Sequence, residues 1–438
     1  MTIRTPLAPC LECGLVSAIP AISGEQNACC PRCGHTLFRQ VIDSHQKVLA
    51  IGTTCLVLLT ISLVFPFMTI SVQGLSHHIV LLNALSVFHY FDNNALAVLL
   101  VLTVILLPAC YVLALMVLFV LAAKKQEGDY PGDSWWVKQL LRFVFRIEHW
   151  LLVDIFLVGV LVSIVKIAAM TDVVMGESFW AFMLFTLMLV KISRATDRHW
   201  LYHHLFRPMP TGKVKAGDTH LSQNHTACRL CHCINIPDEN GDMPDACQRC
   251  HSALQPYNPE KSLTISAALA ITALVLYAPA NLYAMMYTIS FGSTESSTIM
   301  DGVILLWQLG SYPIALVILT ASVIVPLTKM LILFHLLMTA KTTHHPDDSL
   351  AKLKLYRFIE LIGRWSMIDV FVVALLAALV QFNNLMSISP GPAVAYFALV
   401  VIFTLIATMI YDPRALWTQE AISPAITTKP ATQDLPNG

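Results

Sequence analysis

Eight of the twelve cysteines stand in four Cys-x-x-Cys pairs, and these pairs form two sets far apart in the chain. Two such turns joined by a short hairpin bring four thiolates to one point, which is the ligand set of structural zinc. Each set therefore predicts a small zinc ribbon with one Zn ion, in a compartment that keeps thiols reduced. The predicted ligands are Cys10, Cys13, Cys30 and Cys33 in the first ribbon, and Cys228, Cys231, Cys247 and Cys250 in the second.

Four thiolates fill every position of a tetrahedral metal, so no open position remains for catalysis and a structural role is favoured. Iron bound by four thiolates has the same geometry, which leaves a membrane-bound redox protein as an alternative. Cys29 and Cys233 adjoin the two sets, but the Cys-x-x-Cys spacing assigns the ligand positions to Cys30 and Cys231.

Charged residues inside long apolar segments form the second group that could do chemistry. Lys166 and Lys329 lie well inside such segments, and Asp154 and Asp369 lie near the start of theirs. A charge at the centre of a bilayer costs roughly 2.5–3.5 kcal/mol on insertion scales, so it usually faces a cavity or a partner. We expect Lys329 to pair with Asp369 or Asp154, either as a static ion pair or within a proton-coupled or headgroup-binding site.

The segment before Lys329 supports a cavity wall. Pro326 leaves a backbone carbonyl without its helical donor, and Ser322 and Thr328 add hydroxyl groups beside it. The candidate transport residues are therefore Asp154, Lys166, Ser322, Thr328, Lys329 and Asp369.

The elements that carry these residues belong in a membrane. The chain is 56% hydrophobic and 12% charged, against roughly 25% charged for a soluble domain, and its zero net charge gives no indication of nucleic-acid binding. Residues 50–68 and 263–290 contain no charge, and only a bilayer accommodates such runs. Eight spans of the required length are expected, at approximately 48–70, 95–122, 149–171, 178–196, 262–286, 312–340, 366–383 and 391–411.

The basic residues predict the orientation. Lys and Arg concentrate in the connections at 123–148, 197–261 and 341–364, whereas those near 71–94, 172–177, 287–311 and 384–390 contain none. Because basic loops stay on the cytoplasmic side, both ribbons and both termini are predicted to be cytoplasmic.

The chain is also an internal repeat, with its halves aligned at a shift of about 215 residues. The block Trp150–Val158 matches Trp365–Val373, and Asp197 falls on Asp412. Four spans per half predict two parallel all-α units, a recurrent plan in transporters, although a duplicated scaffold without transport is an alternative. The two lysines break the repeat, since Lys166 falls on Gln381 and Lys329 on Tyr111.

These features predict six consecutive parts. They are ribbon 1 at 1–47, a four-helix membrane unit at 48–200, a cytoplasmic linker at 201–226, ribbon 2 at 227–257, a second four-helix unit at 258–417 and a disordered tail at 418–438. The chain contains no Walker A, HExxH or GxSxG motif, so we expect no enzyme activity.

The architecture resembles the paraquat-inducible protein A family of bacterial inner-membrane proteins. The resemblance extends from Cys10 to about Trp417 and is clearest in the blocks Gly363–Asp369, Asp301–Trp307 and Asp412–Arg414.

The resemblance implies an inner-membrane subunit that moves phospholipid or similar amphiphiles between membranes, with links to envelope stress. It implies a periplasmic partner with mammalian-cell-entry (MCE) domains that forms a hydrophobic tunnel, and it implies zinc in both ribbons. Charged residues in the membrane core of the family suggest proton coupling at Asp154, Lys166, Thr328, Lys329 and Asp369. A passive membrane anchor for the MCE partner is the remaining alternative.

Overall fold

The structure is a computed structural model of the 438-residue chain. It describes residues 7–20, 26–72, 75–80, 98, 101–124, 130–168, 172–207, 214–222, 224–238, 241–254, 257–290, 293–308, 310, 312–340, 345–363, 372, 381–382, 386–417 and 432–434.

Six helices in the described part are long and apolar enough to cross a bilayer, so the chain is a mainly helical, multi-pass membrane protein. Their outward side chains are apolar: Leu282 is 77% exposed, Met338 79% and Leu331 69%, as expected of surfaces that contact lipid. The helices are α1 (Ser44–Val64), η1 with α4 (Val101–Ala123), α7 (Glu177–Ala195), α9 (Pro259–Leu282), the segment Ala315–Thr339 formed by α11, η5 and α12, and α15 (Pro392–Ile410).

Two of the eight expected spans differ from this set. The third span of the first half is a shorter helix, α6 (Val153–Ala168), and residues 366–383 lie almost wholly outside the described residues. The shorter helices are α5 (Trp135–Ile147), α8 (Arg198–Leu205), α10 (Ile299–Gln308), α11 (Tyr312–Leu319) and α13 (Pro346–Gly363).

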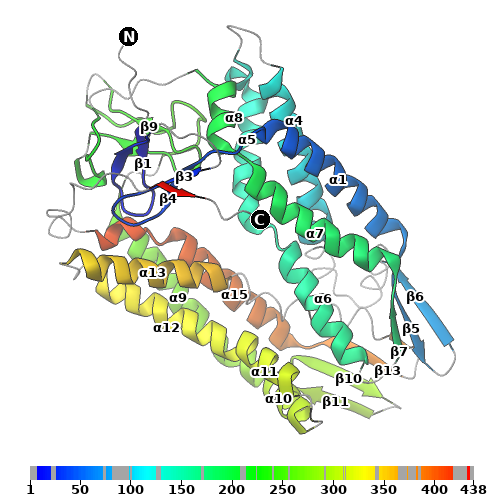
Figure 1. Ribbon diagram of the computed structural model, residues 1–438. Coiled ribbons are helices and arrows are strands. Elements are labelled where there is room, and N and C mark those ends of the chain that lie inside the picture. The colour runs from blue at the N-terminus through cyan, green and yellow to red at the C-terminus, as the bar shows by residue number, and fades with distance from the viewer. Residues whose placement is uncertain are drawn as a thin grey trace.

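The same helix pair is built twice. Helix α1 packs along α7, and α9 packs along α15 (Figure 1). In the first pair Ser44 Oγ donates to the carbonyl of Ala195 at 2.8 Å, and in the second Ser262 Oγ donates to the carbonyl of Ile410 at 2.6 Å. We call residues 44–207 the first membrane unit and residues 259–417 the second.

Each unit also carries a small antiparallel sheet, which the sequence did not predict. Its strands occupy connections between predicted spans and also the ends of the spans predicted at 48–70, 262–286 and 366–383. Both sheets lie at the end of the molecule away from the ribbons (Figure 1). One has the order β6-β5-β7, from Leu75–Val80, Pro66–Val72 and Asp172–Met175. The other has the order β11-β10-β13-β12, from Ser293–Ser297, Met286–Ser290, Met386–Pro390 and Gln381–Phe382.

A glycine closes each sheet onto the following helix. The N–H of Gly176 donates to the carbonyl of Phe67 at 3.0 Å, and that of Gly391 to the carbonyl of Met285 at 2.9 Å. A Cβ would lie 2.0 Å from the carbonyl oxygen of Pro66 at the first position and 2.1 Å from that of Ala284 at the second. Only glycine allows the backbones to approach this closely.

Both units contain a π-helical segment before a proline. The segment Val101–Leu106 (η1) precedes Pro108, and Thr320–Ile324 (η5) precedes Pro326. A proline has no N–H to donate, so the preceding turn widens at both places. Ser322 lies in the second of these segments and is buried.

The cysteine sets form two small β-structures at the other end. Ribbon 1 contains β1 (Leu7–Pro9), β2 (Val16–Ala18), β3 (Gln26–Cys29) and β4 (Thr36–Arg39). Ribbon 2 contains β8 (Thr226–Ala227) and β9 (Ile234–Asn235). Within the predicted tail, Thr432–Asp434 (β14) pairs antiparallel with β3.

Candidate metal centres and the polar membrane core

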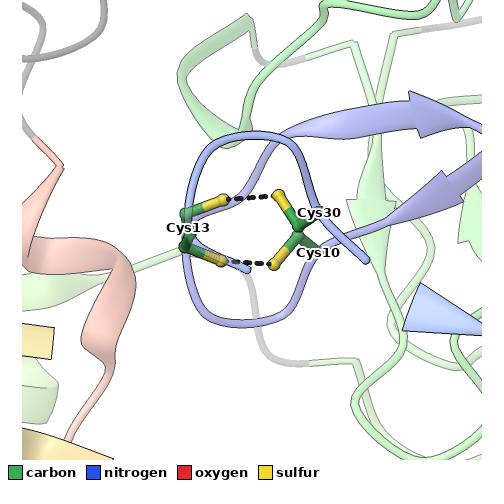
Figure 2. A group of neighbouring side chains, drawn as sticks. Cys10, Cys13 and Cys30 are labelled. Atoms are coloured by element: carbon green, nitrogen blue, oxygen red, sulfur yellow. Dashed lines mark hydrogen bonds between the residues drawn. The ribbon is translucent and has the colours of Figure 1, made fainter. Parts of the chain in front are cut away.

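Ribbon 1 brings four buried sulfur atoms together. Cys10 Sγ lies 3.5 Å from Cys33 Sγ, and Cys13 Sγ lies 3.5 Å from Cys30 Sγ (Figure 2). All four ligand atoms lie within 4.8 Å of one another, and no cysteine of the chain is in a disulfide. A tetrahedron with metal–sulfur bonds of 2.3 Å has sulfur–sulfur edges of about 3.8 Å, so the four thiols fit one tetrahedral ion.

Ribbon 2 has the same arrangement of four sulfur atoms, but different side chains surround it. Cys228 Sγ lies 3.7 Å from Cys250 Sγ, and Cys231 Sγ lies 3.5 Å from Cys247 Sγ. Ser252 Oγ lies 3.2 Å from the first of these sulfurs and 3.0 Å from Cys250 Sγ, so a hydroxyl supports the thiolates. These four sulfurs also lie within 4.8 Å of one another, and the site could hold a metal ion.

The additional cysteines lie outside both groups of four. Cys29 belongs to strand β3, and Cys233 Sγ donates to the carbonyl of Ile234 at 3.6 Å. A metal bound to four thiolates is coordinatively saturated, so each centre could stabilise the fold of its ribbon but offers no open position for substrate.

The turn after each cysteine pair is left-handed. Gly14 has φ 71° and Gly34 has φ 70°, whereas the same positions in ribbon 2 are His232 with φ 55° and His251 with φ 52°. Left-handed backbone lets the N–H of this residue turn back to the carbonyl of the first cysteine: the N–H of Gly14 donates to Cys10 O, and that of Gly34 to Cys30 O, both at 2.9 Å.

Lys329 is a buried cation in the described part of the membrane core. It is 1% exposed on α12, and its Nζ donates to Oγ1 of Thr404 on α15 at 3.1 Å. The last residue of α13, Gly363, closes the site, because a Cβ there would lie 3.0 Å from Nζ. Three helices therefore meet at one ammonium group.

Among the described residues, hydroxyl groups lie along α15 and in the π-helical segment before Lys329. Thr404 Oγ1 donates to the carbonyl of Val401 at 3.0 Å, and Thr408 Oγ1 donates to the carbonyl of Thr404 at 2.5 Å. Ser322 Oγ is buried and has no hydrogen-bond partner among the described residues. Thr328 is half-buried. In the described part of the chain, Lys329 has one hydroxyl acceptor and no carboxylate, so two of its three N–H donors need a further partner.

The acidic candidates do not join it in the described residues. Asp154 is exposed near the start of α6 and forms no ion pair with Lys329. Asp369 lies outside the described residues, as does the side chain of Lys166, whose backbone belongs to α6. Thr404 was missed by the sequence analysis, although two threonines four residues apart in an otherwise apolar helix are a usable signal.

The comparisons with known proteins agree with this architecture. The family model for paraquat-inducible protein A matches residues 45–206 and 263–420. The chain is 37% identical over 413 residues to the intermembrane transport protein PqiA of Escherichia coli, covering 94% of this chain and 95% of that protein.

More distant relatives cover as much of the chain. It is 25% identical over 408 residues to the lipophilic envelope-spanning tunnel protein A of Escherichia coli, covering 93% of this chain and 90% of that protein. It is 25% identical over 420 residues to a probable intermembrane transport protein of Haemophilus influenzae, covering 93% and 95%. No solved structure matches the chain. The chain belongs to the paraquat-inducible protein A family.

Proposed function

We propose that this protein is the inner-membrane subunit of a system that moves phospholipid or similar amphiphiles between membranes, with an MCE-domain tunnel protein as its periplasmic partner. The observation that carries the proposal is the buried Lys329–Thr404 pair, held at the junction of three membrane helices without a described carboxylate. A buried ammonium whose one described acceptor is a hydroxyl suits a phosphate or carboxylate group that arrives from outside.

The names of relatives support the same function. Two of the three relatives above are named as intermembrane transport proteins and the third as an envelope-spanning tunnel protein. None of these names describes an enzyme, and we propose that this chain is not one.

The proposed orientation places the ribbons in the cytoplasm and the two small sheets in the periplasm. The connections rich in Lys and Arg are predicted on the same side of the membrane as the ribbons, and the free thiols suit the reducing cytoplasm. The sheets are then the part that faces the partner. We propose two parallel units of four helices each, with Lys166 and Asp369 contributing to the polar core and zinc in both ribbons.

The transport proposal is tested by following labelled phospholipid between the two membranes of cells that lack this gene, its MCE partner and its paralogues. Reintroducing the wild-type chain should restore the flux, and Lys329→Met should not. Lys191→Met is the matched control, because Lys191 is exposed on α7 and does not face the core. Equal flux from wild type and Lys329→Met, at equal protein in the membrane, contradicts the proposal.

The redox alternative is decided by metal analysis. Two zinc ions per chain and no visible absorption are expected of the purified protein, because zinc has no redox or visible chromophore. Iron with sulfur-to-metal absorption would favour the electron-transfer function instead.

A further inference from the structure

Each ribbon packs on the membrane unit that it does not precede in the sequence. The four cysteines of ribbon 1 belong to the same apolar cluster as Leu336, Leu353 and Trp417 of the second unit. Those of ribbon 2 belong to the same cluster as Leu201 and Tyr202 of the first unit. Each ribbon therefore contacts the unit that it does not precede, for which we call it the exchanged ribbon. It also contacts its own unit: Phe38 of ribbon 1 packs on His199 of the first unit with a centroid distance of 4.6 Å, and Arg229 of ribbon 2 pairs with Asp412 of the second.

Two equivalent arginines make this exchange specific. Arg142 on α5 of the first unit donates from Nη1 to the carbonyl of His251 in ribbon 2 at 3.4 Å. Arg357 on α13 of the second unit donates from Nη2 to the carbonyl of Cys33 in ribbon 1 at 2.9 Å. Their numbers differ by the repeat shift, so the same side chain of each unit contacts the last cysteine turn of the exchanged ribbon.

The ribbon 1 contact is the stronger of the two because it includes a carboxylate. Glu12 lies between Cys10 and Cys13, is 9% exposed, and accepts from Arg357 Nε at 3.1 and 3.3 Å and also from Nη2. The same carboxylate lies 3.0 Å from His35 Nδ1 and 3.9 Å from Cys33 Sγ. Arg357 thus holds the first cysteine turn through Glu12 and the second through the Cys33 carbonyl.

Ribbon 2 lacks this bridge. Leu230 stands at the position of Glu12, and the ion pair of ribbon 2 has the opposite polarity, with Arg229 of the ribbon 2.8 Å from Asp412 of the second unit. On its other side, Arg249 of ribbon 2 lies over the ring of Tyr202 at 5.7 Å. Ribbon 2 therefore touches both units, whereas its cysteine turns receive one long hydrogen bond from Arg142.

We infer that Glu12 and Arg357 are positioning residues of the ribbon 1 metal centre, and that they couple metal occupancy of ribbon 1 to the docking of α13. Four thiolates around a divalent ion leave a net negative charge, and a guanidinium that bridges both turns stabilises the metal-bound arrangement. The far end of α13 is Gly363, which packs on Lys329, so this helix joins the metal centre to the polar membrane core.

The coupling works in both directions, because linkage between two equilibria is reciprocal. If Arg357 favours metal binding, metal binding must favour the docked position of α13 by the same factor. The residues involved belong to ribbon 1 and α13, so the coupling does not depend on what the protein transports.

The first test measures metal protection of each ribbon in the purified full chain. Protein in detergent is incubated with a zinc chelator and a thiol-alkylating reagent, and mass spectrometry of the peptides reports which cysteines become modified. In Glu12→Gln and Arg357→Ala we expect Cys10–Cys33 to be alkylated about 10–100-fold faster than in wild type, because replacing a residue that hydrogen-bonds around zinc ligands usually lowers metal affinity by that factor. Ribbon 2 should keep its wild-type rate in both variants.

Three further variants separate metal positioning from general packing. Arg142→Ala is the matched control and should leave ribbon 1 unaffected. The double variant Glu12→Gln with Arg357→Ala should be no worse than the stronger single variant, because both remove one bridge. The charge exchange Glu12→Arg with Arg357→Glu should recover part of the protection.

The second test measures the effect of metal loss from ribbon 1 on α13, with amide hydrogen exchange as the signal. Cys10→Ser should raise amide exchange in α13 near Arg357 and Gly363, and Cys247→Ser should leave it unchanged. If Cys10→Ser does not accumulate, wild-type protein with and without chelator supplies the same comparison, with α5 as the internal reference. Unchanged ribbon 1 alkylation in Arg357→Ala, or unchanged α13 exchange after metal loss from ribbon 1, overturns the inference.

Discussion

Replacing Gly14 or Gly34 with alanine makes a matched pair of perturbations. Each glycine follows the second cysteine of a pair in ribbon 1, with φ 71° and 70° respectively. An L-residue in this left-handed conformation costs roughly 1–2 kcal/mol, and that cost applies equally to both variants. The surroundings differ, because a Cβ at Gly34 meets nothing within 4 Å, whereas one at Gly14 would lie 2.1 Å from His220 Nδ1.

His220 cannot move away freely. It is 8% exposed, and its backbone N–H donates to the carbonyl of Gly14 at 3.0 Å. Its ring packs on that of Tyr257 with a centroid distance of 4.5 Å. Overpacking at such a site typically costs about 1–3 kcal/mol. We therefore expect Gly14→Ala to destabilise ribbon 1 by about 2–5 kcal/mol in total and Gly34→Ala by about 1–2 kcal/mol.

The assay is thermal unfolding of the purified chain in detergent, with zinc release as the signal. Gly14→Ala should release zinc at a lower temperature than Gly34→Ala, and His220→Ala in the Gly14→Ala background should recover most of the difference. Equal effects of the two alanines, or no recovery with His220→Ala, would refute the contact as the cause.

Three other outcomes follow from described contacts. His251→Gly should stabilise ribbon 2 by about 1 kcal/mol because φ 52° no longer strains a side chain, as read from its zinc-release temperature. Ser262→Ala should lose about 0.6 kcal/mol, the average for a hydrogen bond between membrane helices, and Ser44→Ala should lose more, because Ser44 Oγ also accepts from the N–H of Asp197 at 3.2 Å; an equal or smaller loss for Ser44→Ala in unfolding titrations would argue against this reasoning. Burial lowers the pKa of His220 to about 3, below the ordinary value near 6.5. The unfolded chain thus binds more protons between these values, so stability is full above about pH 6.5 and falls toward pH 3. His220→Leu should flatten that part of the curve of unfolding temperature against pH, and an unchanged slope would contradict this assignment.

Acid should also weaken the Glu12–Arg357 bridge. Burial by itself raises the pKa of Glu12, but hydrogen bonds from His35 and Arg357 outweigh it and hold the pKa below the ordinary carboxyl value. A depressed carboxyl pKa means that the bridge stabilises the fold above the ordinary pKa and is lost as the pH falls through the lower, folded-state value.

The sequence predicted what depends on local spacing and composition. Two Cys-x-x-Cys pairs about 16 residues apart are enough to predict a four-sulfur cluster, because the hairpin between them is short. Long uncharged segments were enough to predict membrane helices, and the six in the described part follow from their length and hydropathy. The family resemblance, carried by blocks such as Gly363–Asp369, is confirmed by the comparisons.

The remaining features depend on contacts between distant residues. Strands such as β7, Asp172–Met175, are too short to have a recognisable alternation, and they exist because β5 provides their partner. The contact of ribbon 1 with the second unit includes the Glu12–Arg357 pair, whose members are 345 residues apart, and a lone arginine in a helix of mixed charge does not indicate its acceptor. Lys329 was recognised as buried in the membrane, but its acceptor Thr404 comes from α15, 75 residues further along the chain.

The most direct test of the central claim is lipid movement by the purified chain and its MCE partner between donor and acceptor vesicles. We predict that wild type and Lys191→Met move phospholipid at the same rate, and that Lys329→Met reduces the rate at least tenfold while both ribbons keep their metal. Phospholipid movement by Lys329→Met at the wild-type rate would contradict the account.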